Sequence, residues 1–134
     1  MSRQLVRDLM HIGVPTCSAD TLLTDAVAIL LRDRLESLIV LDRHGHAAGI
    51  FGQEEAIAAF GLSGAKAGGY KMLTVADAMR PEIPEILPDI PATAAAQIML
   101  DKQVRNLFLM HHDGGIKWPA AVLRFEDVLN HLVC

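Results

Sequence analysis

Residues 26–41, Ala-Val-Ala-Ile-Leu-Leu-Arg-Asp-Arg-Leu-Glu-Ser-Leu-Ile-Val-Leu, join an apolar helical pattern to an apolar strand pattern through a charged turn. The same succession of patterns returns at residues 95–110, where every residue lies 69 positions after its counterpart. An internal repeat of this size predicts two similar half-domains. The duplication therefore decides the fold.

Sequence patterns on the N-terminal side of each copy also repeat. Val6-Arg7-Asp8-Leu9-Met10 and Val75-Ala76-Asp77-Ala78-Met79 each predict a short helical turn. A proline follows five residues after each methionine and favours a short strand near residues 16–17 and 85–86. Asp20 and Asp89 then precede the main helices, where we expect them to accept hydrogen bonds from unpaired amides.

Sequence patterns on the C-terminal side predict a hairpin and a second helix in each copy. Residues 38–41 and 107–110 are short apolar runs typical of buried strands, and we expect tight turns at residues 42–45 and 111–114. The closing helices begin at acidic residues. One apolar face of the second closing helix consists of Val128, Leu129, Leu132 and Val133.

Together these elements predict an α/β (α+β) fold of two pseudo-symmetric β-α-β-β-α repeats, with small mixed sheets flanked by helices. We expect one repeat at residues 1–60 and the other at residues 74–134. The glycine-rich residues 61–73 between them predict a mobile linker. The order of glycine and lysine in this linker does not match a phosphate-binding P-loop.

Composition restricts the function classes. The 134 residues are 51% hydrophobic and 21% charged, as in a folded globular protein, and the formal net charge is −4. This charge disfavours nucleic acid and anionic membranes as partners. The N-terminus lacks the apolar core of a signal peptide, and no apolar run has the length of a membrane helix, so we expect a cytoplasmic protein. Cys17 and Cys134 are too few for a disulfide framework and are expected to be buried or terminal free thiols.

No serine or cysteine lies in a recognisable nucleophile–base motif, so we expect no catalytic residues and no enzyme. Histidines cluster at His44 and His46 and at His111 and His112, but no cysteine or carboxylate completes a zinc set, and we expect exposed turn histidines rather than a metal site. Trp118 either contacts a partner or covers the core of its own hairpin.

The doubled Val-x-Asp-x-Met openings, the constant helix-to-strand spacing and the segment Gly49-Ile50-Phe51-Gly52-Gln53-Glu54-Glu55 resemble a tandem cystathionine-β-synthase (CBS) domain pair, or Bateman module. The resemblance covers almost all of residues 6–132. It implies repeats that pack through their sheets, clefts for adenosine-containing ligands, and a regulatory rather than catalytic role. It also implies a homodimer, by analogy alone.

The resemblance also implies ligand-binding residues. The acid that ends the closing motif contacts ribose in the family; it corresponds to Asp127 in the second repeat and to Glu55 in the first. The family's phosphate-contacting Thr or Ser is replaced by Arg124 and Gly52. The resemblance further implies a phosphate contact at Arg105. It also implies adenine contacts at Glu85, Ile86 and Phe108 in the second repeat and at Thr16, Cys17 and Ile39 in the first.

We therefore expect a regulatory module that binds AMP, ADP, ATP or S-adenosylmethionine in the cleft between the repeats, mainly through the second repeat. No cofactor is required, and an unidentified effector protein reads the output. The alternative is a ligand-free scaffold for dimerisation or partner binding, which Gly52 and Glu55 favour. For Asp127 the competing interpretation is an acid that only stabilises the start of a helix, and Arg105 and Arg124 are alternatively ordinary surface charges.

Overall fold

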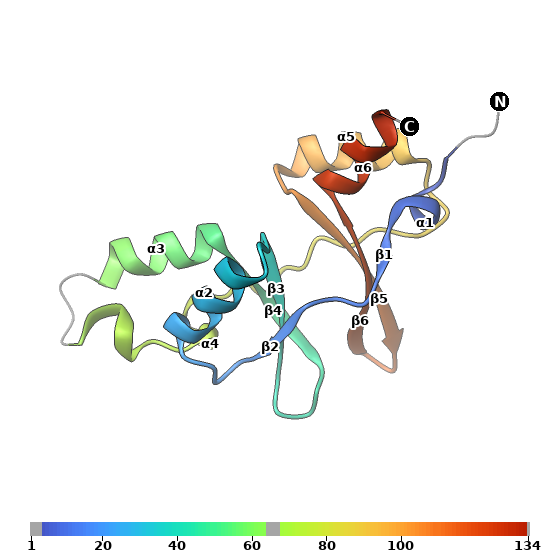
Figure 1. The fold of residues 1–134 in the computed structure, drawn as a ribbon. Helices are drawn as coiled ribbons and strands as arrows, with labels where there is room; N and C mark the ends of the chain where they lie inside the picture. Colours follow the sequence, from blue (N-terminus) through green and yellow to red (C-terminus); the bar gives the residue numbers. More distant parts are fainter. Residues whose placement is uncertain (1–3, 64–67, 134) are drawn as a thin grey trace. The chain divides into compact units, whose positions relative to one another are not determined.

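The structure, a computed structural model, describes residues 4–63 and 68–133. It confirms the mixed α/β class, with two small sheets flanked by helices (Figure 1). The elements in chain order are α1 (Val6–Leu9), β1 (His11–Ile12), β2 (Thr16–Ser18), α2 (Leu23–Arg32), β3 (Ser37–Leu41), β4 (Ala47–Gly52), α3 (Gln53–Ser63), the 3-10 helix η1 (Gly69–Met72), α4 (Val75–Ala78), α5 (Ala92–Lys102), β5 (Asn106–Asp113), β6 (Ile116–Arg124) and α6 (Phe125–Leu132).

The chain folds into two compact units. One combines Met1–Val14 with Pro84–Cys134 and is called the split unit below; the other, Pro15–Ile83, is called the continuous unit. The units do not coincide with the two sequence repeats, because each unit takes its short leading helix, α1 or α4, from the other repeat. The predicted boundaries therefore delimit the two sequence repeats, whereas the compact units have other boundaries.

The split unit contains a sheet in the order β1-β6-β5, in which both neighbouring pairs are antiparallel. His11 of β1 lies opposite Val122 of β6. At the other edge of the sheet, Glu85 forms a parallel bridge with Phe108 of β5. Helices α1, α5 and α6 lie together near one end of β5 and β6, while the hairpin tip points away from them (Figure 1). The buried core consists of Val6, Ile86, Ala95, Met99, Leu107 and Leu123.

The continuous unit repeats this plan with β2-β3-β4, where β2 and β3 are parallel and β3 and β4 antiparallel. Arg80 forms an antiparallel bridge with Ile50 of β4, as His11 does with Val122 of β6. Arg80 lies 69 positions after His11, so the bridge repeats the duplication. The buried core consists of Cys17, Leu23, Ala26, Leu30, Leu38, Val40, Phe51 and Val75.

Backbone hydrogen bonds attach each leading helix to its unit. The Val6 amide donates to the Ile90 carbonyl at 2.8 Å, and the Val75 amide donates to the Thr21 carbonyl at 2.8 Å. Val6 and Val75 are both fully buried. The exchange of leading segments is therefore reciprocal, and each segment contributes one buried valine to the core that it joins.

The predicted capping role of Asp20 and Asp89 is wrong. Helices α2 and α5 have Leu22 and Pro91 at their N-caps, and neither has a side-chain cap. Instead, their first amides donate to backbone carbonyls of the exchanged segments: Leu23 to Leu73 at 2.9 Å, and Ala92 to Gln4 at 2.8 Å. Asp20 accepts a hydrogen bond from the Ser18 hydroxyl, and Asp89 pairs with Arg7 at 2.5 Å.

The second hairpin is longer than predicted. Its turn lies at Gly114 and Gly115, with φ of 59° and 85°, and not at residues 111–114. Consecutive positive φ values suit a two-residue hairpin turn, and adjacent glycines adopt them without strain. His111, His112 and Asp113 consequently belong to β5.

The predicted linker is partly helical. Helix α3 continues to Ser63, which is buried, and η1 begins at Gly69. Residues 64–67 of this linker lie outside the described residues, as does Cys134. Of the predicted apolar face of the second closing helix, Val128 alone packs against the core, as Phe125 of α6 also does, whereas Leu129, Leu132 and the C-cap residue Val133 are exposed.

Candidate functional site

Asp127 lies in the first turn of α6, where its carboxylate caps the helix. Its Oδ2 atom accepts a hydrogen bond from the Arg124 amide at 2.8 Å. Glu55 has the same role at the start of α3, where its Oε1 atom accepts from the Gly52 amide at 2.9 Å. Each predicted ribose-binding acid therefore also stabilises a helix N-terminus, by about 0.3–1 kcal/mol for a typical dipole interaction.

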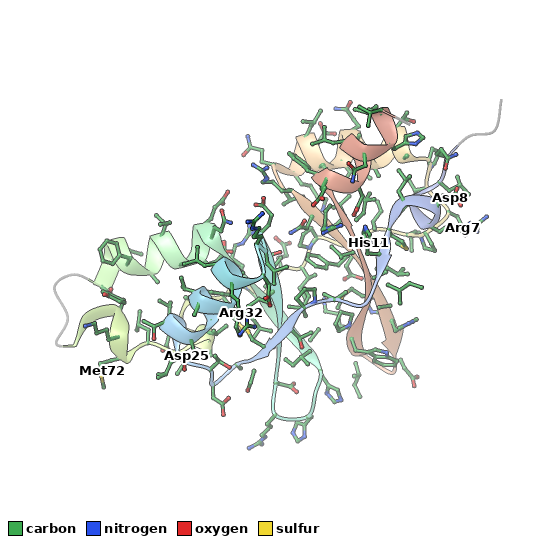
Figure 2. All side chains as sticks on the ribbon, viewed as in Figure 1. Arg7, Asp8, His11, Asp25, Arg32 and Met72 are labelled. Carbon is green, nitrogen blue, oxygen red and sulfur yellow. The ribbon has the colours of Figure 1, made fainter. Side chains whose placement is uncertain are left out.

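Two cationic or potentially cationic side chains cover the Asp127 carboxylate. Arg124 donates from Nε to Oδ2 at 3.3 Å and from Nη2 to Oδ1 at 2.9 Å. His11, which comes from β1 (Figure 2), lies with Nε2 at 2.6 Å from Oδ1. The Asp127 side chain is only 2% exposed. The hydrogen bond to Asp127 raises the pKa of Arg124, so this guanidinium stays charged.

Arg105 approaches the same helix start from the segment before β5. Its guanidinium carbon lies 5.0 Å from the centroid of the Phe125 ring, and its carbonyl accepts from the Phe125 amide at 3.0 Å. A cation at this distance from an aromatic ring is attracted by the ring quadrupole. Phe125 directly follows Arg124, so the structure places both predicted phosphate-binding arginines at the beginning of α6.

The predicted adenine-contacting residues of the second repeat lie at one sheet edge. Phe108 donates from its amide to the Pro84 carbonyl at 2.9 Å, and its carbonyl accepts from the Ile86 amide at 2.9 Å. The Ile86 amide is therefore already engaged. In a parallel bridge of this kind, the amide and carbonyl of the intervening residue, Glu85, point to the opposite side. Ile86 and Phe108 are buried, with 4% and 1% exposure.

The side chain of Glu85 is bound by the extended second hairpin. Its Oε1 atom lies 2.7 Å from His112 Nε2, and its Oε2 atom lies 3.4 Å from Lys117 Nζ. Trp118 lies beside His111 of the paired strand, with 5.6 Å between ring centroids, and is 39% exposed. The additional hairpin residues thus reach back to the predicted adenine edge.

The predicted first-repeat residues lie in the continuous unit. The Glu55 carboxylate accepts from Arg80 Nε at 3.0 Å and is 9% exposed. At Gly52, a Cβ atom would lie 2.6 Å from the Glu36 carbonyl oxygen and 3.2 Å from Ser37 Cβ, so close backbone packing explains the missing hydroxyl. Thr16 is exposed and lies opposite Ile39 in the parallel ladder.

The structure brings Asp127, Arg124 and Arg105 together at the start of α6. It joins Glu85, Ile86 and Phe108 at the edge of the β1-β6-β5 sheet. Sequence reasoning missed His11 and Arg80, which cover the two carboxylates. A signal was present, because both residues follow the methionine of a repeated Val-x-Asp-x-Met opening. The binding roles of these residues stay predictions.

Other candidate chemistry is limited in the described part of the chain. Residues 4–63 and 68–133 contain no group of three His, Cys, Asp or Glu side chains arranged to hold a metal ion. Across those same ranges, every helix is too short or too polar to span a membrane. Cys17 is a buried free thiol, as predicted, and burial raises its pKa to about 11.

The two units have the same arrangement of strands and helices, and each has a carboxylate at the start of its closing helix. The protein is therefore a module of two paired repeats. The family model for the CBS domain matches this chain twice, at residues 6–61 and 75–133. The chain belongs to the CBS domain family. Among curated proteins, none matches it by sequence.

Solved structures show the same fold. A CBS-domain containing protein from Agrobacterium tumefaciens is 21% identical, with a TM-score of 0.79 over 94% of this chain and 91% of that chain. CBSX2, solved in complex with AMP, is 20% identical, with a TM-score of 0.75 over 96% of both chains. The CBS domain pair of protein MJ0100, solved with 5′-methylthioadenosine and S-adenosyl-L-methionine, is 18% identical, with a TM-score of 0.77 over 98% of both.

Proposed function

We propose that this chain is a regulatory module that binds an adenosine-containing ligand, AMP, ADP, ATP or S-adenosylmethionine, mainly through its second repeat. The observation that carries the proposal is the buried Asp127 carboxylate at the position of the family's ribose-binding acid, with Arg124 bound to it and Arg105 at the same helix start. The ligands named for CBSX2 and MJ0100 support this class. A carboxylate accepts hydrogen bonds from both ribose hydroxyls, and guanidinium groups at a helix N-terminus suit phosphate.

The second repeat is the better candidate for the ligand site because more basic side chains lie at its acid than at the acid of the first repeat. Two side chains, Arg124 and His11, cover Asp127, and Arg105 lies at the same helix start. Glu55 has Arg80 alone among its described side-chain partners, and Gly52 supplies no side chain. For adenine, the outward-pointing amide and carbonyl of Glu85 offer one donor and one acceptor.

Calorimetric titration with AMP, ADP, ATP and S-adenosylmethionine tests the proposal. We expect at least one ligand to bind wild type, and Asp127→Asn to weaken that binding by about tenfold or more, since the amide cannot accept both ribose hydroxyls with full charge. Glu55→Gln changes the corresponding acid of the first repeat and should weaken binding less than Asp127→Asn does. A ligand at about 100 times its Kd should also stabilise the fold by about 2.7 kcal/mol.

The alternative function is a scaffold that binds no ligand and serves dimerisation or partner binding. Exposed apolar side chains favour this alternative. Large apolar side chains are exposed on α3, namely Ile57, Phe60 and Leu62, and on α6 and its C-cap, namely Leu129, Leu132 and Val133. Such side chains mark association surfaces when they are contiguous. If none of the ligands binds at millimolar concentration and sedimentation shows a dimer, the scaffold replaces the sensor.

The proposal also includes a homodimer and an effector protein that reads the bound state. It further includes a cytoplasmic location and no catalytic activity. A ligand changes such a module's output only if it binds two arrangements with different affinity. Sedimentation with and without ligand tests whether the ligand shifts association.

A further inference from the structure

The Asp127 carboxylate has no acceptor position left for a ribose. Its Oδ2 accepts from the Arg124 amide at 2.8 Å and from Arg124 Nε at 3.3 Å, and its Oδ1 accepts from Arg124 Nη2 at 2.9 Å and His11 Nε2 at 2.6 Å. An ionised carboxylate offers about four lone-pair positions. Ribose hydroxyls therefore reach Asp127 only after present partners leave.

The partners that can leave are side chains. The Arg124 amide is fixed by the backbone at the start of α6, whereas the Arg124 and His11 side chains are 35% and 57% exposed. The carboxylate beneath them is 2% exposed, so these two side chains form its cover. The 2.6 Å contact with an acceptor-only carboxylate requires a proton on His11 Nε2, so His11 is a donor in this arrangement.

Removing this cover has an electrostatic consequence. The Arg124 guanidinium is always charged, and moving it away from Asp127 separates an ion pair whose carboxylate is buried. The separation is offset when an anion meets the guanidinium, and phosphate suits its planar donor fork. Arg105, 5.0 Å above the Phe125 ring, adds a second guanidinium at the same helix start.

We propose that this exchange makes the second-repeat site selective for phosphorylated adenine nucleotides over adenosine and S-adenosylmethionine. The nucleotide phosphate takes the donors of Arg124 and His11, and the ribose hydroxyls take the Asp127 acceptor positions that those donors vacate. Adenosine offers no anion for the displaced Arg124 guanidinium. S-adenosylmethionine offers one carboxylate but also brings a sulfonium and an ammonium charge, which the guanidinium repels. The inference rests on the proposed function and names the ligand class of that site.

The continuous unit provides a matched control. Glu55 is covered by Arg80, whose side chain is 51% exposed and whose Nε lies 3.0 Å from Oε2. Arg80 corresponds to His11 in the duplication, and Gly52 stands where the split unit has Arg124. Changing Arg80 therefore removes a guanidinium from the first-repeat acid and leaves Arg124, His11 and Arg105 in the sequence.

The test compares the Kd values of AMP, adenosine and S-adenosylmethionine by calorimetry in one buffer. For wild type we expect AMP to bind about tenfold or more tightly than the other two, as the gain of a charge-assisted hydrogen bond implies. In Arg124→Gln the ratio of adenosine to AMP Kd should fall towards one, because AMP binds more weakly while adenosine binds no worse. His11→Ala should lower the same ratio less, Arg124→Lys should keep part of the preference, and Arg80→Gln should leave it unchanged.

The outcomes separate the two proposals. Adenosine or S-adenosylmethionine binding as tightly as AMP overturns the selectivity and leaves the proposed function standing. Equal weakening of AMP and adenosine by Arg124→Gln overturns the exchange, because Arg124 then serves only the fold. Absence of binding by all three ligands overturns both proposals. Should Arg124→Gln fail to fold, an unchanged ratio in His11→Ala and Arg124→Lys overturns the exchange.

Discussion

Gly52 occupies a position where a Cβ atom does not fit. That atom would lie 2.6 Å from the Glu36 carbonyl oxygen, which is backbone and cannot swing away as a flexible side chain can. Gly61, within α3, has nothing within 4 Å of the same added atom. Alanine is therefore expected to fit at Gly61 but not at Gly52.

We predict that Gly52→Ala destabilises the protein by about 1–3 kcal/mol, the usual cost of overpacking. Gly61→Ala should instead stabilise it by about 0.5–1 kcal/mol, because alanine has the higher helix propensity. Urea denaturation of both variants measures the change. Equal free energies of unfolding for Gly52→Ala and wild type would show that the β4–α3 junction relaxes at no cost.

Single residues also show how far the sequence leads towards the candidate site. Asp127 and Arg124 are found from the closing motif, and they do contact each other at 2.9 Å. His11 cannot be assigned to Asp127 by local pattern, since 116 positions separate them and a strand pairing brings them together. Motif spacing reports neighbours within one segment, and it does not report which distant strand joins the sheet.

At the scale of the element, strand β2 places a thiol in the core. Thr16 and Ser18 are exposed while Cys17 between them is buried, as the two-residue period of a strand requires. Burial raises the pKa of the Cys17 thiol to about 11 from 9.0. The thiol is therefore neutral in the folded protein around pH 7–9, where the reactive thiolate would otherwise begin to form.

We predict that Cys17 in a Cys134→Ser background reacts slowly with a thiol reagent at pH 8 and that its rate rises as pH approaches 11. The unfolded protein should react fast already near pH 9, because its thiol has the ordinary pKa. Since the folded pKa is the higher one, this group's contribution to stability is complete below pH 9 and is lost as pH rises through 11. A folded-state rate equal to that in urea at pH 8 would contradict the burial of Cys17.

The elements also show which patterns predict structure well. The helix-to-strand spacing predicts α2, β3, α5 and β5, because apolar periodicity reflects the face that each element buries. The turn of the second hairpin is misplaced, because His111 and His112 are polar and resemble loop residues although they pair with Trp118 and Lys117. Polar residues in exposed paired strands lack the apolar alternation by which a strand is recognised in a sequence.

At the scale of the whole molecule, the exchange of leading segments is the main feature that the sequence does not display. Both openings have the same Val-x-Asp-x-Met pattern, so nothing local distinguishes which half either one joins. Backbone hydrogen bonds and buried valines in the structure make that assignment. The overall class follows from the repeat, whereas the partition into compact units depends on contacts distant in sequence.

Val6→Ala and Val75→Ala test this partition as a matched pair. Each removes two methyl groups from a fully buried valine, and each should destabilise its unit by about 2 kcal/mol. In hydrogen exchange followed by mass spectrometry, Val6→Ala should reduce protection in residues 84–133 and spare residues 15–63. Val75→Ala should do the reverse. If Val6→Ala loosened residues 15–63 instead, the assignment of α1 to the split unit would be wrong.

The reciprocal exchange also sets an order of assembly on the ribosome. Pro15–Ile83 is one continuous stretch and can fold as soon as it has emerged, because domains generally fold as units during synthesis. Residues 4–14 are made before this stretch, yet β1 must wait for its partner β6, which is made after it. At roughly 5–20 residues per second, the segment that carries His11 stays without its strand partner for several seconds. A segment made before the continuous unit thus pairs only after that unit has been made, and a neighbouring nascent chain has that interval in which to bind it.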